Sequence, residues 1–175
     1  MPYKNIFATF IVSIGLTLSA GTVIAENDPS SKYKVLSIEN SSLSISSINS
    51  FLDNAEASIK KGNMDQAVNN LEKAKNVSSL LINYYTDLNS SFQGIDALIP
   101  RELSKKNKNV INLLAKANIL LATIHQSKGD PELAVPLLVD VVKSLTPANP
   151  MGAKAYQKLF ELGFVEIPYR GASEQ

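Results

Sequence analysis

Two stretches of this 175-residue chain follow nearly the same pattern. Ala55–Ala74 reads AEASIKKGNMDQAVNNLEKA, and Ala122–Val141 reads ATIHQSKGDPELAVPLLVDV. In each, a helical pattern is broken by Gly-Asn or Gly-Asp, and an alanine five residues after the glycine begins a second one. Gly62 and Gly129 are 67 residues apart, which is about twice the period of roughly 34 residues of helix-turn-helix solenoid repeats. The spacing predicts stacked pairs of antiparallel helices.

The size pattern within these stretches resembles the tetratricopeptide repeat family, in which small residues lie where two helices cross and large apolar residues lie beside them. The resemblance implies an all-α fold over residues 48–163, namely a short right-handed array of about five helices built from antiparallel helical hairpins. An ordinary five-helix bundle with small residues at its crossings is the alternative. The repeat-packing residues that the resemblance implies are Phe51, Ala55, Ala67, Leu71, Ala74, Ala122, Ala134 and Leu138.

Apolar residues at three- and four-residue steps predict where the helices lie. The expected helices are 45–61, 64–88, 102–128 (or 107–128), 131–145 and 151–162. Between the two copies of the pattern, no third signature is present. Either a degenerate repeat occupies this slot, or the two long middle helices form a hairpin of their own.

The first 25 residues have the layout of a secretory signal peptide. Lys4 precedes an uncharged, largely apolar segment, 6–25, which ends in Val-Ile-Ala before Glu26. We expect cleavage there and export to the periplasm or an equivalent lumen. The alternative is an uncleaved membrane anchor, because about 20 apolar residues can span a bilayer. Residues 26–47 are expected to be a flexible linker, and residues 164–175 an extended C-terminal tail.

Charge and cysteine content exclude several classes of function. Without residues 1–25 the chain carries 16 basic and 16 acidic side chains, so electrostatics favour neither nucleic acid nor an anionic membrane surface as a partner. Membrane contact is expected only through residues 6–25, if they are retained. The chain has no cysteine, which excludes disulfides, thiolate metal ligands and a cysteine nucleophile. We interpret the basic residues Arg101, Lys105, Lys106 and Lys108 as the solvated start of a helix.

No pattern indicates catalysis or a cofactor. His125 is the single histidine, and because a metal site needs three or four ligands we expect it to pack or to interact with a helix C-terminus. The sequence contains no glycine-rich phosphate loop and no serine-centred nucleophile elbow. Tyr84 and Tyr85, with their neighbouring leucines, are expected to belong to the core. We therefore expect no enzymatic activity, no metal and no cofactor.

The family resemblance implies a module that binds a protein or peptide, acting as a scaffold or assembly factor. The alternative function is a membrane-anchored accessory subunit of a larger complex. By resemblance, the partner would lie against the first helix of each repeat. The expected partner-binding face is then Asn49, Leu52, Glu56, Lys60, Lys116, Ile119, Thr123 and Gln126. The tail is expected either to occupy a groove of its own chain or to be the segment that a partner grips.

Overall fold

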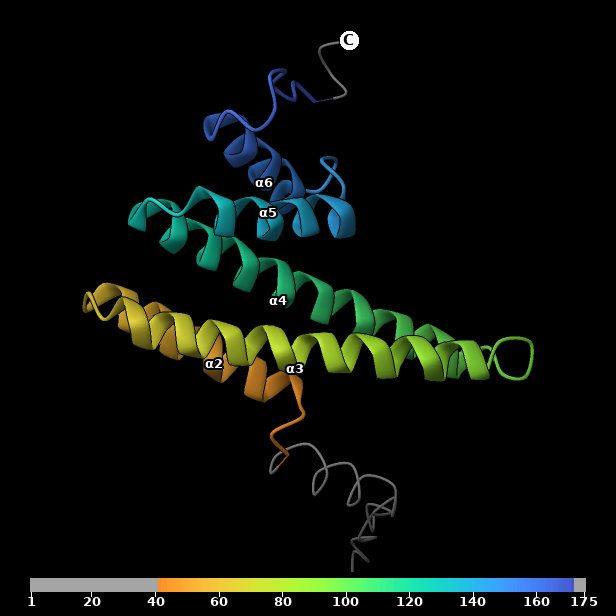
Figure 1. The fold of residues 1–175 in the computed structure, drawn as a ribbon. Helices are drawn as coiled ribbons and strands as arrows, with labels where there is room; N and C mark the ends of the chain where they lie inside the picture. Colours follow the sequence, from red (N-terminus) through yellow and green to blue (C-terminus); the bar gives the residue numbers. More distant parts are fainter. Residues whose placement is uncertain (1–40, 172–175) are drawn as a thin grey trace, which may run out of the picture.

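The computed structural model describes residues 41–171, and within them the chain is all-α. The helices are α2 (Ile45–Lys60), α3 (Met64–Ser91), α4 (Leu98–Lys128), α5 (Pro131–Leu145) and α6 (Pro150–Glu161). Each packs mainly against the next in the sequence, with weaker contacts from α4 to α2 and to α6. Figure 1 shows the resulting stack, with α2 and α3 at one end and α6 at the other. The predicted all-α array is confirmed. The expected signal peptide and residues 26–40 of the expected linker lie outside the described residues.

The two glycines of the repeated pattern end α2 and α4. Gly62 and Gly129 have φ angles of 76° and 83°, in the left-handed region that glycine adopts without steric cost. After each glycine, the next backbone amide donates a hydrogen bond to the carbonyl oxygen five residues before it, at 2.9 and 3.0 Å. These bonds satisfy carbonyl groups that the helix ends leave unpaired. The chain therefore reverses direction at both glycines.

Helix α4 begins at Leu98, earlier than the expected start at Glu102. The carboxylate Oδ1 of Asp96 accepts hydrogen bonds from the amides of Leu98 and Ile99, at 2.7 and 2.8 Å. Pro100 falls in the first turn, where an amide has no acceptor within the helix. Pro100, which precedes the expected start of this helix, therefore lies inside it.

Helix α2 begins at Ile45, where the apolar spacing predicts it, so residues 45–47, which were also assigned to the expected linker, are helical. The Ser44 hydroxyl oxygen accepts a hydrogen bond from the Ser47 amide at 3.1 Å, as an N-terminal cap does. Asp130, the residue before α5, makes no side-chain cap hydrogen bond. Instead α5 starts with Pro131, whose fixed φ suits a first helical position.

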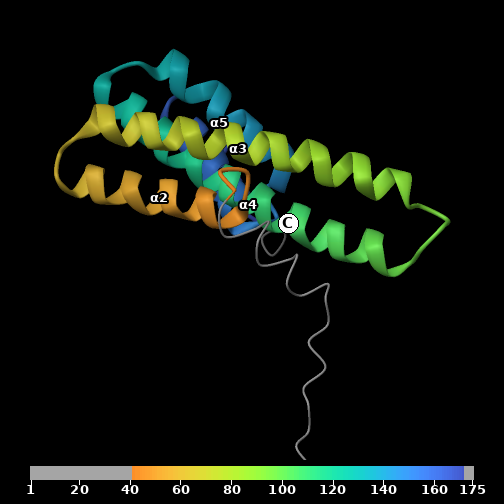
Figure 2. The ribbon, with the colours of Figure 1, turned by 90° about the horizontal axis from the view of Figure 1, so that it is seen from below.

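The long helices α3 and α4 occupy the region between the two copies of the repeated pattern. They have 28 and 31 residues and pack against each other as a hairpin of their own. Because α2 has only 16 residues, the far ends of α3 and α4 extend beyond it, as Figure 2 shows. We call residues 80–108 the arm.

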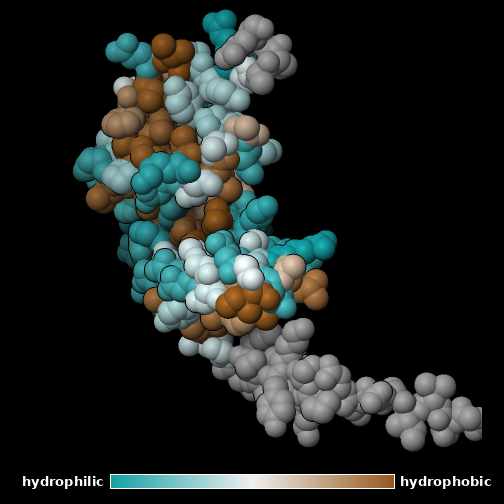
Figure 3. All heavy atoms as spheres, turned by 90° about the vertical axis from the view of Figure 1, so that its right-hand side faces the viewer, coloured by the Kyte–Doolittle hydropathy of each residue, from teal (hydrophilic) through white to brown (hydrophobic). Residues whose placement is uncertain are grey.

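Apolar side chains are exposed on the arm, contrary to expectation. Leu81 is buried and Tyr85 is half-buried, whereas Leu80, Tyr84 and Leu88 are exposed. Burial raises the pKa of Tyr85 above its ordinary value of 10.0. Figure 3 looks onto the end of the arm, where hydrophobic side chains also gather. The exposed apolar side chains at the tip include Ile95, Leu98 and Ile99. The four basic residues from Arg101 to Lys108 follow them along α4 and are also exposed.

The described part of the tail, residues 164–171, packs back against α6. The Tyr156 hydroxyl donates a hydrogen bond to the Ile167 carbonyl oxygen at 2.9 Å, and the Tyr156 and Tyr169 rings meet edge to face at 6.4 Å. Val165 packs against the core, while Phe164 and Ile167 remain exposed. The tail therefore makes contacts of its own with α6.

Candidate functional site

The structure places the expected repeat-packing residues in the core or at its edge. The ring of Phe51 is partly buried and lies 6.0 Å from the ammonium nitrogen of Lys73. The other seven are at most 1% exposed: Ala55, Ala67, Leu71, Ala74, Ala122, Ala134 and Leu138. Alanine adds little width at a crossing, so two helix axes can approach closely there.

The expected partner-binding face is divided by the contact between α2 and α4. Leu52 and Ile119 are 1% and 6% exposed, so assigning them to a binding surface was wrong: the neighbouring helices cover both. Glu56 Oε1 and Lys116 Nζ lie 2.7 Å apart and join the two helices. These two residues bind each other across the face that was expected to hold a partner.

The other residues of that face remain accessible. Asn49, Lys60 and Thr123 are exposed, and Gln126 is half-buried. The Thr123 hydroxyl donates to the Ile119 carbonyl oxygen at 2.8 Å, as an outward-facing helical threonine commonly does. Their role in partner binding stays a prediction.

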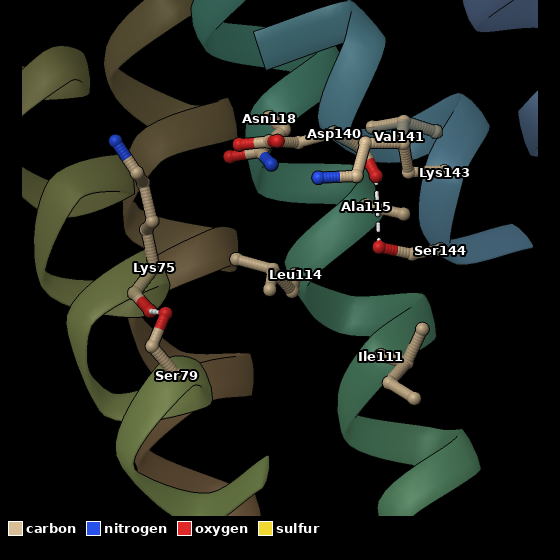
Figure 4. A pocket seen from close by; sticks show the side chains of 10 residues that line it. All are labelled: Lys75, Ser79, Ile111, Leu114, Ala115, Asn118, Asp140, Val141, Lys143 and Ser144. Carbon is tan, nitrogen blue, oxygen red and sulfur yellow. Dashed lines mark hydrogen bonds between the residues drawn. The ribbon is translucent and has the colours of Figure 1, made fainter. Parts of the chain in front are cut away.

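A pocket of about 160 Å³ lies on a different side of α4, between α3 and α5. Figure 4 shows Lys75 and Ser79 on α3 facing it from one side, and Asp140, Lys143 and Ser144 on α5 from the other. Its apolar lining is Ile111, Leu114, Ala115 and Val141, and its remaining polar lining residue is Asn118.

A second pocket, of about 310 Å³, adjoins the first. It shares Ile111 and Ser144 with the first pocket and adds Lys108, Asn112, Leu145, Thr146 and Asn149. We call the two together the α3–α5 groove. Its lining carries three lysines, Lys75, Lys108 and Lys143, against the single carboxylate of Asp140, so its rim is positively charged.

Asn118 is the most unusual residue in the groove. Its side chain is 3% exposed, and its Oδ1 atom has no hydrogen-bond partner among the described residues. A buried oxygen without a partner costs about 1–3 kcal/mol. Asn107 Oδ1 and His125 Nδ1 are in the same condition, but neither residue lines the groove. Asn118 can be singled out in the sequence, because it is a polar residue in the row of buried apolar positions of α4 between Leu114 and Leu121.

The serines of the groove are not arranged as nucleophiles. Ser79 donates its hydroxyl hydrogen to the Lys75 carbonyl oxygen at 3.0 Å, and Ser144 donates to that of Asp140 at 2.8 Å. A serine nucleophile is instead hydrogen-bonded to a general base. Within residues 41–171, no three acidic, histidine or cysteine side chains come together as a metal site would require. The hydroxyl hydrogens of both serines are therefore used within their own helices.

Thr146, at the far end of the groove, has a strained backbone. Its φ of 55° and ψ of 156° fall in a region that a β-branched residue rarely occupies, at a cost of about 1–3 kcal/mol. Among the described residues it is the one non-glycine with a positive φ. Such strain is concentrated at functional sites, and here it is located in the lining of the second pocket.

Replacing Thr146 with glycine should therefore raise the free energy of unfolding by about 1 kcal/mol, since strain relief exceeds the entropic cost of glycine. Urea denaturation measures the change. Ser144→Gly, in the last turn of α5, is the control and should lower the free energy by about 0.5 kcal/mol. A loss in Thr146→Gly as large as in the control would show that position 146 is unstrained.

Comparison of the chain with protein-family models, with curated proteins and with solved structures finds no match. The helices between residues 41 and 171 include none that is both long and apolar enough to cross a membrane. Function must therefore be inferred from the α3–α5 groove itself.

Proposed function

We propose that this chain is a non-catalytic helical module that binds an extended segment of a protein or peptide in the α3–α5 groove, as a scaffold or assembly factor. The observation that carries the proposal is Asn118, a buried amide with an unpaired oxygen in the wall of the groove. A side-chain amide both donates and accepts hydrogen bonds. It therefore matches a peptide backbone, which presents N–H and C=O groups in alternation.

The size of the groove favours an extended chain over a cofactor. Sites for drug-sized ligands occupy about 300–1,000 Å³ in one concave space. The second pocket, at about 310 Å³, is at the lower limit of that range, and the first, at about 160 Å³, is below it. Extended backbone advances about 3.3 Å per residue with side chains alternating between its two faces. Alternate side chains of one peptide lie on the same face and can therefore enter both pockets.

The charge of the groove favours an acidic segment. Lys75, Lys108 and Lys143 outnumber Asp140 at the rim, although Lys75 also lies 3.5 Å from Glu72 on its own helix. Complementary charge across an interface speeds association and selects among partners. We therefore propose that the bound segment carries more carboxylates than basic side chains.

Two further elements of the proposal rest on the sequence. The hairpins α2–α3 and α4–α5 coincide with the two copies of the repeated pattern, which supports a degenerate tetratricopeptide-like repeat. The leader-like residues 1–25 support export, with a mature chain that starts at Glu26. Retention of segment 6–25 would instead support a membrane-anchored accessory subunit.

Photocrosslinking from matched surface positions tests the proposal. A benzophenone amino acid replaces Ser79 or Ser144 in the groove and, as controls, Asn49 or Thr123 on the expected partner-binding face; all four are exposed. Cells that make the full chain are irradiated, and mass spectrometry identifies the crosslinked segment and the chain's own amino terminus. We expect one acidic segment crosslinked from positions 79 and 144. Crosslinks only from positions 49 and 123, or from none of the four, would contradict the proposal.

A further inference from the structure

Helix α3 extends beyond the first turn of α2. There, one side of α3 carries apolar side chains that no described residue covers. Leu80, Tyr84 and Leu88 are 46%, 47% and 47% exposed. Their four-residue spacing places them in one line along the helix. We call these three residues the apolar stripe. It differs from the other face of α3, which is buried against α4 and includes Leu81.

The apolar stripe continues the edge of the contact between α3 and α2. Lys73 marks that edge, since it is exposed and its ammonium nitrogen lies 6.0 Å from the centre of the Phe51 ring of α2. Leu80 and Tyr84 follow Lys73 by seven and eleven residues, about two and three helical turns. They therefore extend the surface that Lys73 shares with α2.

The register of the α2–α3 hairpin shows which part of the chain comes next along this surface. Phe51 and Lys73 each lie eleven residues from Gly62, so positions equally distant from Gly62 are level with each other. By this rule Ile45, the first residue of α2, is level with Ser79. The apolar stripe thus starts level with the first turn of α2, and the chain enters the described structure at that point.

We propose that residues 33–38 of the same chain lie over the apolar stripe. This segment reads YKVLSI, in which Tyr33, Val35, Leu36 and Ile38 are apolar, and it ends three residues before Ser41, the first described residue. Leu80 and Leu88 are about 12 Å apart along α3. Even at a helical rise of about 1.5 Å per residue, the chain from Ser44 to Leu36 spans that distance.

A tethered segment fits this surface better than a second copy of the chain. A stable protein–protein interface buries about 1,200–2,000 Å² in total, which is more than three half-exposed side chains supply. A segment joined to α2 binds intramolecularly, so a small apolar contact is enough to hold it. This inference concerns α2 and α3 alone and is independent of the groove.

The absence of cysteine from the chain permits a clean disulfide test. Leu36→Cys is combined with Leu88→Cys in the full chain, and the control combines Leu36→Cys with Ser90→Cys, an exposed position on another side of α3. Mild oxidation at low micromolar concentration is followed by mass and by non-reducing electrophoresis. We expect the 36–88 bond to form within one chain at least ten-fold faster than the 36–90 bond. Equal rates, or disulfide-linked dimers, would overturn the inference.

Hydrogen exchange gives a second test without cysteines. Leu36→Asp with Ile38→Asp should increase amide exchange across residues 80–91 several-fold, because charged side chains would not remain on the apolar stripe. The control pair, Ser31→Asp with Lys32→Asp, lies outside the segment and should leave exchange unchanged. Unchanged exchange in the first pair would overturn the inference even if both proteins fold normally.

Discussion

Replacing Gly152 with alanine is expected to lower the free energy of unfolding by about 3 kcal/mol. A β-carbon at this position would lie 1.9 Å from the Thr146 carbonyl oxygen and 2.6 Å from its carbonyl carbon, far inside van der Waals contact. Both atoms are backbone, so no side-chain rotation relieves the clash. The loop from α5 to α6 must move away from α6, and the packing around the buried Ala155 would be lost with it.

Thermal denaturation measures this effect, and Gly163→Ala separates its cause from ordinary glycine strain. Gly163 has a φ of +72°, and nothing lies within 4 Å of the place that an alanine β-carbon would take. Its alanine variant should therefore lose only about 1–2 kcal/mol from the left-handed backbone. Gly152→Ala should melt clearly below Gly163→Ala. Equal melting temperatures would show that the loop yields at little cost.

The second large effect is expected at the helix crossings, where Ala67→Leu and Ala134→Leu should each cost about 1–3 kcal/mol. Both alanines have no exposed surface, so an isobutyl group must push two helices apart. Ala57→Leu, exposed on α2, is the matched control and should change stability by less than about 0.5 kcal/mol. Chemical denaturation of the three variants provides the comparison.

The two crossings belong to different hairpins, so the double variant tests the interpretation further. Ala67 lies on α3 and Ala134 on α5, and the effects of separated sites usually add. We expect the combined loss to equal the sum of the single losses. If both single variants melt like the unsubstituted chain, the small-residue packing interpretation is wrong.

Local patterns are sufficient to predict most of the fold. Gly62 and Gly129 end helices through backbone geometry that depends on a few neighbouring residues, and apolar spacing identifies a helix from its own sequence. The predicted start of α4 at Glu102 is wrong because it leaves Pro100 outside the helix. The Asp96 carboxylate, which caps that helix, is the signal that corrects it.

The candidate site is less predictable because it depends on contacts between distant segments. The burial of Leu52 and Ile119 and the Glu56–Lys116 ion pair follow from the approach of α2 to α4, which neither helix specifies alone. The groove likewise needs α3, α4 and α5 together. The sequence shows Asn118 as a polar residue among the apolar positions of α4, but it does not show that Asn118 lines a pocket.

The most direct test of the proposed binding site is Asn118→Leu, measured for stability and for crosslinking from position 79. Leucine has the same number and branching of side-chain heavy atoms and removes the unpaired buried oxygen, so the free energy of unfolding should stay the same or rise by about 1 kcal/mol. We expect the crosslink to the partner segment to be lost in this well-folded variant. An unchanged crosslink would contradict the groove as the binding site, and a marked loss of stability would show that Asn118 serves the fold instead.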